Sequence, residues 1–190
     1  MTDLYIVRHG ETEWSKSGQH TSVTELELTS AGREQASRLN GWLDPADFDL
    51  ILCSPRTRAQ QTARLAGFDS FEIDEDLAEW DYGDLEGRTS AEIRQLVPGW
   101  RIWTDFVPGG EQQTDVVARM TRVMNRTRFS GHRKVIAFGH GHAMRVLATC
   151  WIGLPIAKGA SLPLQTGTVS ILGYEKETPA IVRWNAAPGA

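Results

Sequence analysis

Cysteine is scarce in this chain of 190 residues, and long apolar runs are missing altogether. The two cysteines, Cys53 and Cys150, lie in apolar segments. We therefore expect them to be reduced core residues, because neither shows the spacing of a disulfide or metal pair. No apolar run approaches the ~20 residues that a membrane-spanning helix requires, and the N-terminus lacks the basic-then-apolar pattern of a secretion signal. The sequence thus predicts a cytoplasmic protein without membrane association.

An excess of charge of one sign is also lacking. Twenty Lys and Arg residues stand against 24 Asp and Glu residues, a net charge of −4, which argues against a general nucleic-acid-binding surface. The hydrophobic content of 41% is ordinary for a globular protein, and a chain of this length can bury a substantial core. With no internal repeat or linker, we expect one domain over 1–190. The expected partner is a small molecule, and a homodimer is compatible with the sequence.

Apolar and amphipathic segments alternate along the chain. The short runs at 4–7, 50–53 and 135–138 are continuously apolar, as expected for strands whose two faces are both covered by helices. The pattern predicts an α/β fold, a three-layer sandwich with a mostly parallel central sheet. The expected strands are 4–8, 49–53, 71–74, 134–138, 168–174 and 180–184, and the expected helices are 29–43, 56–66, 89–96, 112–129 and 142–152. A polar loop at 11–28, an irregular cap at 75–110 and a loose tail at 185–190 complete the prediction.

Polar residues follow two of these strands directly. The first strand ends in Arg8, His9 and Gly10, and the strand at 134–138 leads to His140 and Gly141. Arginine offers a planar fork of donors that matches phosphate oxygens. A neutral histidine is a nucleophile, and glycine lets the backbone approach a ligand closely. From the first strand alone, a salt-bridged arginine beside a core histidine is an equally good interpretation.

The helix at 56–66 carries Arg56 and Arg58 in its first turn. Because the helix dipole already makes that end positive, two cations there indicate a bound anion. Parallel sheets bind ligands at the carboxyl ends of their strands. We therefore expect Arg8, His9, Arg58 and His140 to converge on a phosphate.

Five motifs in this order resemble those of the histidine phosphatase superfamily, which has the phosphoglycerate-mutase-like fold. They are RHGETEW at 8–14, the pattern S-x-x-x-R-A-x-x-T at 54–62, LAEWDYGDLEG at 77–87, PGGE at 108–111 and GHGHAMR at 139–145. Together they cover nearly the whole chain. The residues within the motifs are most similar to those of a branch of acid phosphatases and sugar bisphosphatases that includes sedoheptulose-1,7-bisphosphatase.

The resemblance implies roles for individual residues. His9 would accept the phosphoryl group as a phosphohistidine, with Arg8, Arg58 and His140 around its oxygens. The spacing of the second motif selects Arg58 over Arg56. Glu79, beside Trp80, would protonate the leaving group and later activate water. The residues expected to contact the substrate are Gly10, Thr12, Ser15, Thr21 and Gly141.

Other polar residues have weaker predictions. Without the family motif, Glu79 would be interpreted as a solvated surface carboxylate. Glu86 and Glu111 are expected to be structural, tying down backbone amides or arginines. His142 follows His140 closely, but no carboxylate or cysteine stands at a suggestive spacing, so we expect no metal and no cofactor. Gln19, His20, Arg56 and His142 receive no firm role. Trp80, Trp100 and Trp103 either wall the pocket mouth or pack under the cap.

Three functions fit the motifs. The favoured one is a phosphatase that hydrolyses small phosphomonoesters, preferably sugar phosphates or bisphosphates. A cofactor-dependent phosphoglycerate mutase would have to grip a second anionic group and exclude water, and the mutases use an inserted segment with Lys and paired Arg for this. The corresponding segment here, 98–111, is short and has only Arg101 as a basic residue. A non-catalytic phospholigand-binding module is the least favoured, because both histidines, both arginines and the acid are present.

Overall fold

Six strands form one sheet in the computed structural model, which describes residues 1–188. The strands are β1 Asp3–Arg8, β2 Leu50–Cys53, β3 Glu72–Ile73, β4 Lys134–Gly139, β5 Val169–Glu175 and β6 Thr178–Ala186. Their spatial order is β3-β2-β4-β1-β5-β6. The pairs β1–β4, β2–β4 and β2–β3 are parallel, whereas β1–β5 and β5–β6 are antiparallel. The sheet is therefore mixed and mainly parallel, as the sequence predicts.

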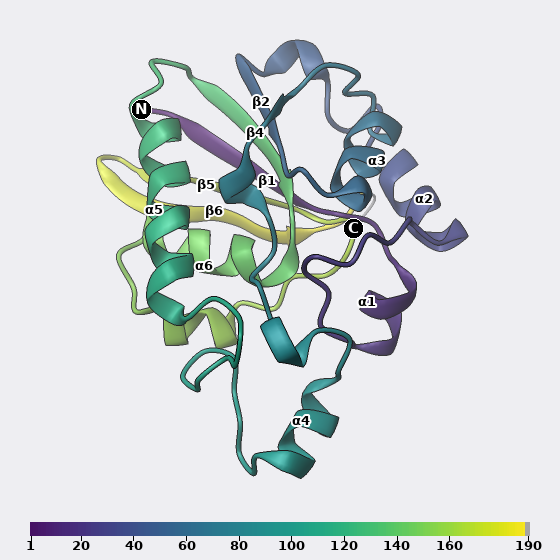
Figure 1. Ribbon diagram of the computed structural model, residues 1–190. Helices are drawn as coiled ribbons and strands as arrows, with labels where there is room; N and C mark the ends of the chain where they lie inside the picture. Colours follow the sequence, from purple (N-terminus) through teal and green to yellow (C-terminus); the bar gives the residue numbers. More distant parts are fainter. Residues whose placement is uncertain (189–190) are drawn as a thin grey trace.

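Helices cover both faces of the sheet (Figure 1). The helices are α1 Glu13–Ser17, α2 Ser30–Ser37, α3 Thr57–Leu65, α4 Ser90–Leu96, α5 Gln113–Arg128 and α6 Gly141–Trp151. On one face, α5 and α6 pack their apolar residues against Leu4 and Ile6 of β1. On the other face, α3 and the chain after α2 pack against Val7, because successive strand residues point to opposite sides. The predicted three-layer sandwich is confirmed.

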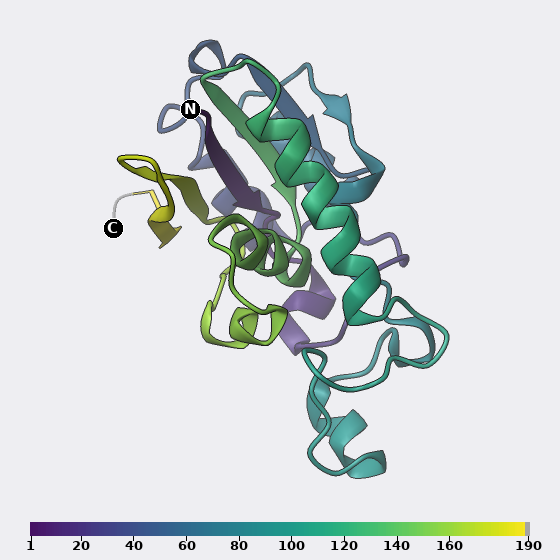
Figure 2. The same ribbon diagram turned by 90° about the vertical axis from the view of Figure 1, so that its left-hand side faces the viewer.

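The cap is the segment between β3 and α5. It contains two 3-10 turns, Glu75–Leu77 and Gly83–Leu85, followed by α4. Figures 1 and 2 show α4 at the end of the molecule that lies away from the N-terminus. Thr89 caps α4 by accepting from the backbone N–H of Glu92, whose side chain accepts from the Thr89 N–H in return. The short helix predicted at 89–96 is confirmed.

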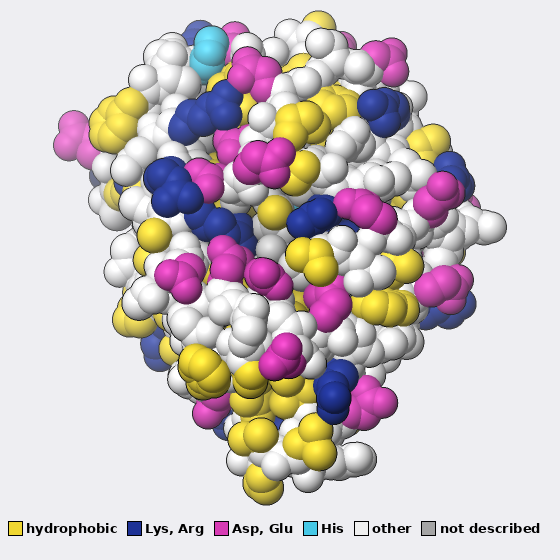
Figure 3. Space-filling view, viewed as in Figure 1, with side chains coloured by type: hydrophobic (Ala, Val, Ile, Leu, Met, Phe, Trp, Pro, Cys, Tyr) yellow, Lys and Arg dark blue, Asp and Glu magenta, His cyan; other side chains and the backbone are white. Residues whose placement is uncertain are grey.

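The surface around this cap differs from the rest of the visible face. In Figure 3, acidic and basic side chains are interspersed over most of the face, whereas apolar side chains gather at its lower end. Exposed apolar residues of the cap include Leu96, Val97 and Phe106. Within residues 1–188, no helix combines the length and apolar composition needed to cross a membrane.

Two predicted boundaries are wrong. The loop expected at 11–28 contains α1, and α2 ends at Ser37 although the sequence predicted a helix to Leu43. Arg38 is the C-cap of α2, and Gly41, whose φ of +84° is a left-handed conformation, lets the chain turn before Leu43. Leu39 and Leu43 are nevertheless buried, so the apolar pattern gave the right core residues in the wrong element.

The expected loose tail is partly strand. β6 extends to Ala186, and Asn185 anchors this end by donating its backbone N–H to Ser170 Oγ and accepting from the N–H of Gln165. The last two positions of the predicted tail, 189–190, lie outside the described residues.

We predict that Gly10→Ala destabilises the fold much more than Gly139→Ala. A Cβ at Gly10 would lie 2.3 Å from the carbonyl oxygen of Gly32 in α2, a backbone atom that cannot move alone. A Cβ at Gly139 would meet the terminal methyl of Met144 at 2.4 Å, which a flexible side chain can vacate. Overpacking of this kind costs about 1–3 kcal/mol or more. Urea denaturation measures the difference, and equal losses in the two variants would contradict this explanation.

Candidate active site

Parallel pairing of β1 with β4 brings two histidines together. The register aligns Arg8 with Gly139, and the His9 N–H continues the ladder by donating to the Gly139 carbonyl at 3.0 Å. His9 and His140 therefore leave neighbouring strand ends at the same level. Their ring centroids are 5.2 Å apart, with the planes tilted by 60°. The convergence expected from the sequence is present.

The hydrogen bond of His9 fixes which of its nitrogens can react. Nδ1 lies 2.7 Å from the Gly10 carbonyl oxygen. A carbonyl only accepts, so Nδ1 carries the proton and Nε2 has a free lone pair. Burial, followed by the nearby charges of Arg58 and Arg8, lowers the pKa of His9 well below its ordinary value. The ring is therefore neutral and nucleophilic near neutral pH.

His140 makes a different contact. Its Nε2 lies 2.7 Å from Oγ of Ser54, while its Nδ1 is buried and has no partner among the described residues. Burial, then the charge of Arg58, lowers the pKa of His140 well below the ordinary value. An anion at Nδ1 would both supply the missing partner and favour the proton that this nitrogen needs as a donor.

Two arginines, the fully buried Arg58 and the partly buried Arg8, flank these rings, and neither forms an ion pair with a described carboxylate. Arg58 donates through its two terminal nitrogens to the carbonyls of Thr21, Ser22 and Thr24. Arg8 donates Nη1 to the Leu164 carbonyl. Burial lowers the pKa of both guanidiniums. In each of them Nε is buried and has no partner, so each retains a donor for a ligand.

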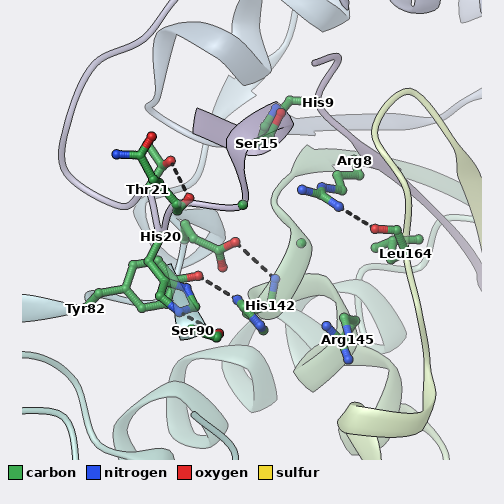
Figure 4. A pocket seen from close by; sticks show the side chains of 14 residues that line it. Arg8, His9, Ser15, His20, Thr21, Tyr82, Ser90, His142, Arg145 and Leu164 are labelled. Atoms are coloured by element: carbon green, nitrogen blue, oxygen red, sulfur yellow. Dashed lines mark hydrogen bonds between the residues drawn. The ribbon is translucent and has the colours of Figure 1, made fainter. Parts of the chain in front are cut away.

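A cavity of about 210 Å³ opens in front of His9 (Figure 4). Of the residues predicted from the sequence, it is lined by Arg8, His9, Ser15, Thr21, Glu79 and Gly141. Arg58 and His140 are fully buried beside it. Gly141 has a visible purpose, because a Cβ there would lie 3.2 Å from the Cζ and Nε atoms of Arg8.

Thr12 does not line the cavity and has a structural contact, so its expected contact with the substrate stays a prediction. Its hydroxyl is fully buried and caps α1, accepting from the Ser15 N–H at 3.2 Å. Ser15 returns the bond, since its Oγ accepts from the Thr12 N–H at 2.9 Å. Gly10 packs closely against Gly32, and its expected contact with the substrate also stays a prediction. A capping box at 12–15 was legible in the sequence as Thr-x-x-Ser, but the serine made it a weak signal.

Glu79 lies in the cavity wall and at the N-terminus of α6. Its Oε1 accepts from the N–H groups of Trp80 and Ala143, and its Oε2 accepts from the His142 N–H at 3.0 Å. The carboxylate is 7% exposed and shares the cavity with Arg8 and His9. These bonds fix its position in the wall of the cavity that His9 also lines.

The two other carboxylates of the motifs are structural, as predicted. Glu86 accepts from the N–H groups of Ser22 and Thr24, which holds the loop under Arg58. Glu111 forms a two-point pair with Arg119 and accepts from the Asp81 N–H. Both connect loops to helices or to the cap rather than facing the cavity.

Four residues without a firm prediction now have definite places. His20, Gln19 and His142 line the cavity, whereas Arg56 forms a partly exposed ion pair with Glu25 at 3.4 Å. His20 is 7% exposed, and burial lowers its pKa to about 4.

The sequence analysis missed several wall residues, chiefly Tyr82 and Arg145. Tyr82 OH lies 2.6 Å from Nδ1 of His142, and burial raises the pKa of Tyr82 well above its ordinary value. Arg145 stands three residues after His142 on α6 and therefore shares its helix face. That spacing, inside the quoted GHGHAMR motif, was the signal that could have identified Arg145.

The tryptophans of the cap both pack and form walls. Trp80, Trp100 and Trp103 are buried in the larger core cluster. Trp103 in addition lines a second cavity of about 230 Å³, which meets the first at Ser90 and His142. Among residues 1–188 there is no group of three or more His, Cys, Asp or Glu side chains able to hold a metal ion.

Comparison with known proteins places this site in a family. Residues 4–187 match the family model of the histidine phosphatase superfamily, branch 1. An acid phosphatase of Mycobacterium tuberculosis is 41% identical over 90% of this chain and 86% of its own length. The sedoheptulose 1,7-bisphosphatase of Saccharomyces cerevisiae is 37% identical over 80% of this chain and 68% of its own.

A solved structure agrees with these relatives. A protein from a Mycobacterium tuberculosis open reading frame superposes with a TM-score of 0.93 at 37% identity, covering 98% of each chain. The fold with its paired histidines defines a phosphate-handling α/β protein. The chain belongs to the histidine phosphatase superfamily, branch 1.

We predict that the free energy of unfolding falls as the pH is lowered from 7 to 5. Burial holds the pKa values of His9, His140 and His142 well below 6.5, and that of His20 at about 4. Below about pH 6.5 the unfolded chain therefore takes up protons that the folded chain does not, which favours unfolding. Each histidine contributes at most about 1.4 kcal/mol per pH unit.

Urea denaturation at several pH values measures this slope. The variant His20→Asn removes one of the four groups, so its stability should decline less steeply than that of the parent over the same range. A stability that is constant or rises between pH 7 and pH 5 would show that these rings are not held neutral in the folded state.

Proposed function

We propose that this chain is a phosphatase of small phosphomonoesters, with sugar phosphates and bisphosphates as the favoured class, and that it acts through a phosphohistidine at Nε2 of His9. One observation carries the proposal. Three buried nitrogens beside His9, namely Nε of Arg8, Nε of Arg58 and Nδ1 of His140, have no partner among the described residues. Buried polar atoms are normally hydrogen-bonded, so three such atoms around one nucleophile indicate an acceptor-rich ligand.

The chemistry follows from these positions. Nε2 of His9 attacks phosphorus, the N–P bond forms, and the bond from phosphorus to the ester oxygen breaks. Arg8, Arg58 and His140 stabilise the charge on the three equatorial oxygens, which is the main demand of phosphoryl transfer. Glu79 gives its proton to the departing alkoxide and then removes one from the water that attacks the phosphohistidine. Inorganic phosphate and neutral His9 are regenerated.

The cap supports hydrolysis over isomerisation. A mutase must retain its product and keep water from the phosphohistidine, which calls for several cations in the cap. The segment 98–111 has Arg101 as its one basic residue, and this side chain is exposed. The relatives named acid phosphatase and sedoheptulose 1,7-bisphosphatase support the same choice. Interconversion of 2- and 3-phosphoglycerate without phosphate release would instead favour the mutase.

A cytoplasmic location and a homodimeric state remain sequence-based expectations within this proposal. Burial raises the pKa of the Cys53 thiol to about 12, so this cysteine is kept protonated and unreactive, as suits a reduced core residue.

We predict that His9→Ala abolishes phosphate release while leaving the fold intact. Loss of the nucleophile should lower kcat by at least about 10³-fold, since the remaining donors only bind the phosphoryl group. The measurement is phosphate release from p-nitrophenyl phosphate and from sugar bisphosphates across pH 4–8, with thermal unfolding as the check on folding. Turnover near the parent rate in the variant would identify a different nucleophile, and an inactive parent on every substrate would contradict the proposed function.

We predict that Glu79→Gln affects alkyl phosphates more than aryl phosphates. A sugar alkoxide needs a proton in order to leave, whereas p-nitrophenolate leaves without one, so the loss for sugar phosphates should be roughly 10²–10⁴-fold and clearly smaller for p-nitrophenyl phosphate in the phosphorylation step. Single-turnover kinetics isolate that step. Glu111→Gln is the matched control, because Glu111 binds Arg119 and neither residue lines the cavity. Equal losses on both substrates for Glu79→Gln would remove it as the proton donor.

A further inference from the structure

A third arginine, Arg145, lies in the wall of the cavity and forms no ion pair with the described carboxylates. It projects from α6 and lines the same space as Arg8, His9 and Glu79. Figure 4 shows it on the helix that carries His142, on the same side of the cavity as Arg8. Within residues 1–188, no carboxylate forms an ion pair with Arg145. Glu79 is the one carboxylate in the described lining, and three backbone amides already bind it.

The guanidinium of Arg145 is held in place. It lies over the ring of Trp103 with its Cζ 4.4 Å from the ring centroid. Nε donates to the Gly159 carbonyl at 2.9 Å and Nη2 to the Ala160 carbonyl at 3.2 Å. Gly159 in turn must lack a side chain, because a Cβ there would lie 2.5 Å from the Trp103 ring. Nη1 has no acceptor among the described residues.

Removing the charge of Arg145 from water costs free energy, which a bound anion would offset. Burial lowers the pKa of Arg145 to about 10, so the group is desolvated yet still cationic at neutral pH. The two carbonyls occupy only Nε and Nη2, and stacking on Trp103 uses the face of the guanidinium. A fixed, partly dehydrated guanidinium with a free donor is well suited to a phosphate or carboxylate group.

The position on the helix sets the spacing of such a group from the reactive phosphate. Gly141, at the first turn of α6, lies next to Arg8, since an added Cβ there would be 3.2 Å from the guanidinium Cζ. Arg145 stands four residues later, which is about 6 Å along the helix axis and on the same face. The adjoining cavity, which is reached past Ser90 and His142, brings the exposed arginines Arg94 and Arg101 to the same end. Arg94 and Arg101 are exposed, so Arg145 is the cation that is held in a fixed position at this end of the cavity.

We propose that Arg145 forms a second anion subsite, so that the substrate carries a phosphate or carboxylate a few bonds away from the phosphoryl group that is transferred. This inference rests on the proposed function and narrows its substrate class to metabolites with an anion at each end. A monophosphate with a neutral tail would leave the charge of Arg145 without a partner.

The test compares substrates in the parent and in Arg145→Met. The probes are fructose 1,6-bisphosphate, 3-phosphoglycerate and the neutral-tailed ester glycerol 2-phosphate. Because a hydrogen bond to a charged group contributes about 1.5–3 kcal/mol, kcat/KM for the anionic-tailed probes should fall roughly 10- to 100-fold, mainly through KM. The neutral-tailed ester should change less than about threefold. Arg145→Lys, which keeps the charge, should recover part of the loss.

The matched control is Arg128→Met. Arg128 also lies 4.4 Å over a tryptophan ring, that of Trp151, and donates to a backbone carbonyl, but it is outside the cavity. It should therefore leave the ratio between the probes unchanged. A uniform loss on all three probes in Arg145→Met, or no loss on any, would overturn the subsite. A loss confined to the bisphosphate or to the phosphoglycerate would identify which anion Arg145 binds.

Binding measurements separate this inference from the proposed function. In a His9→Ala background no turnover occurs, and calorimetric titration gives the affinity for each probe directly. The preference for anionic tails should be present there and should disappear with Arg145→Met, whether or not the parent hydrolyses these compounds. Equal affinities of the His9→Ala variant for the bisphosphate and for glycerol 2-phosphate would contradict the subsite, even if the parent were an active phosphatase.

Discussion

The parallel register of β1 and β4 is the constraint on which the rest of the site depends. Arg8 aligns with Gly139, so the residues that follow, His9 and His140, face each other across adjacent strand ends. A slip of one residue would send Leu4, Ile6 and their neighbours to the wrong faces of the sheet. The burial of two apolar strand faces therefore fixes, without any direct bond between the two rings, how far apart the two imidazoles lie.

The second constraint is the way in which the protein holds buried cations. Arg8 and Arg58 are satisfied mostly by backbone carbonyls of Leu164, Thr21, Ser22 and Thr24. Carbonyl dipoles hold a guanidinium in place but do not cancel its charge, so the positive potential stays available in the cavity. Burial is the main cause that lowers the pKa of His9 and His140, and the positive potential of the arginines adds to it, so both rings stay neutral. Burial beside fixed cations therefore favours a neutral His9 and, in the same cavity, an anionic ligand.

The sequence was sufficient for the elements whose pattern is local and strong. Continuous apolar runs predicted β1, β2 and β4, and the residues at their ends predicted which side chains converge. It was insufficient where a residue has two chemically reasonable uses. The hydroxyl of Thr12 could contact a ligand or cap α1, and only the position of Ser15 decides between these uses.

The extent of α2 shows the same limit for local structure. The apolar positions Leu39 and Leu43 continue the spacing of a helix, yet the chain turns at Gly41 and still buries both leucines. Periodicity identifies which side chains are buried and not always the backbone that carries them. The motif spacing places Arg145 on the helix face of His142, but its contacts with Trp103 and Gly159, which are distant in the sequence, form only in the folded protein.

Helix α6 contributes residues to both ends of the cavity. In its first turn, Gly141 lies next to Arg8, and the N–H groups of His142 and Ala143 bind Glu79. Its second turn supplies Arg145. Because one rigid helix carries Gly141 and Arg145 and binds Glu79, the distances between these residues cannot change independently. With Arg145 as the proposed second anion subsite, a substrate would be selected by the distance between its two charged ends. Such an enzyme would discriminate by length and charge before it discriminates by the identity of the sugar.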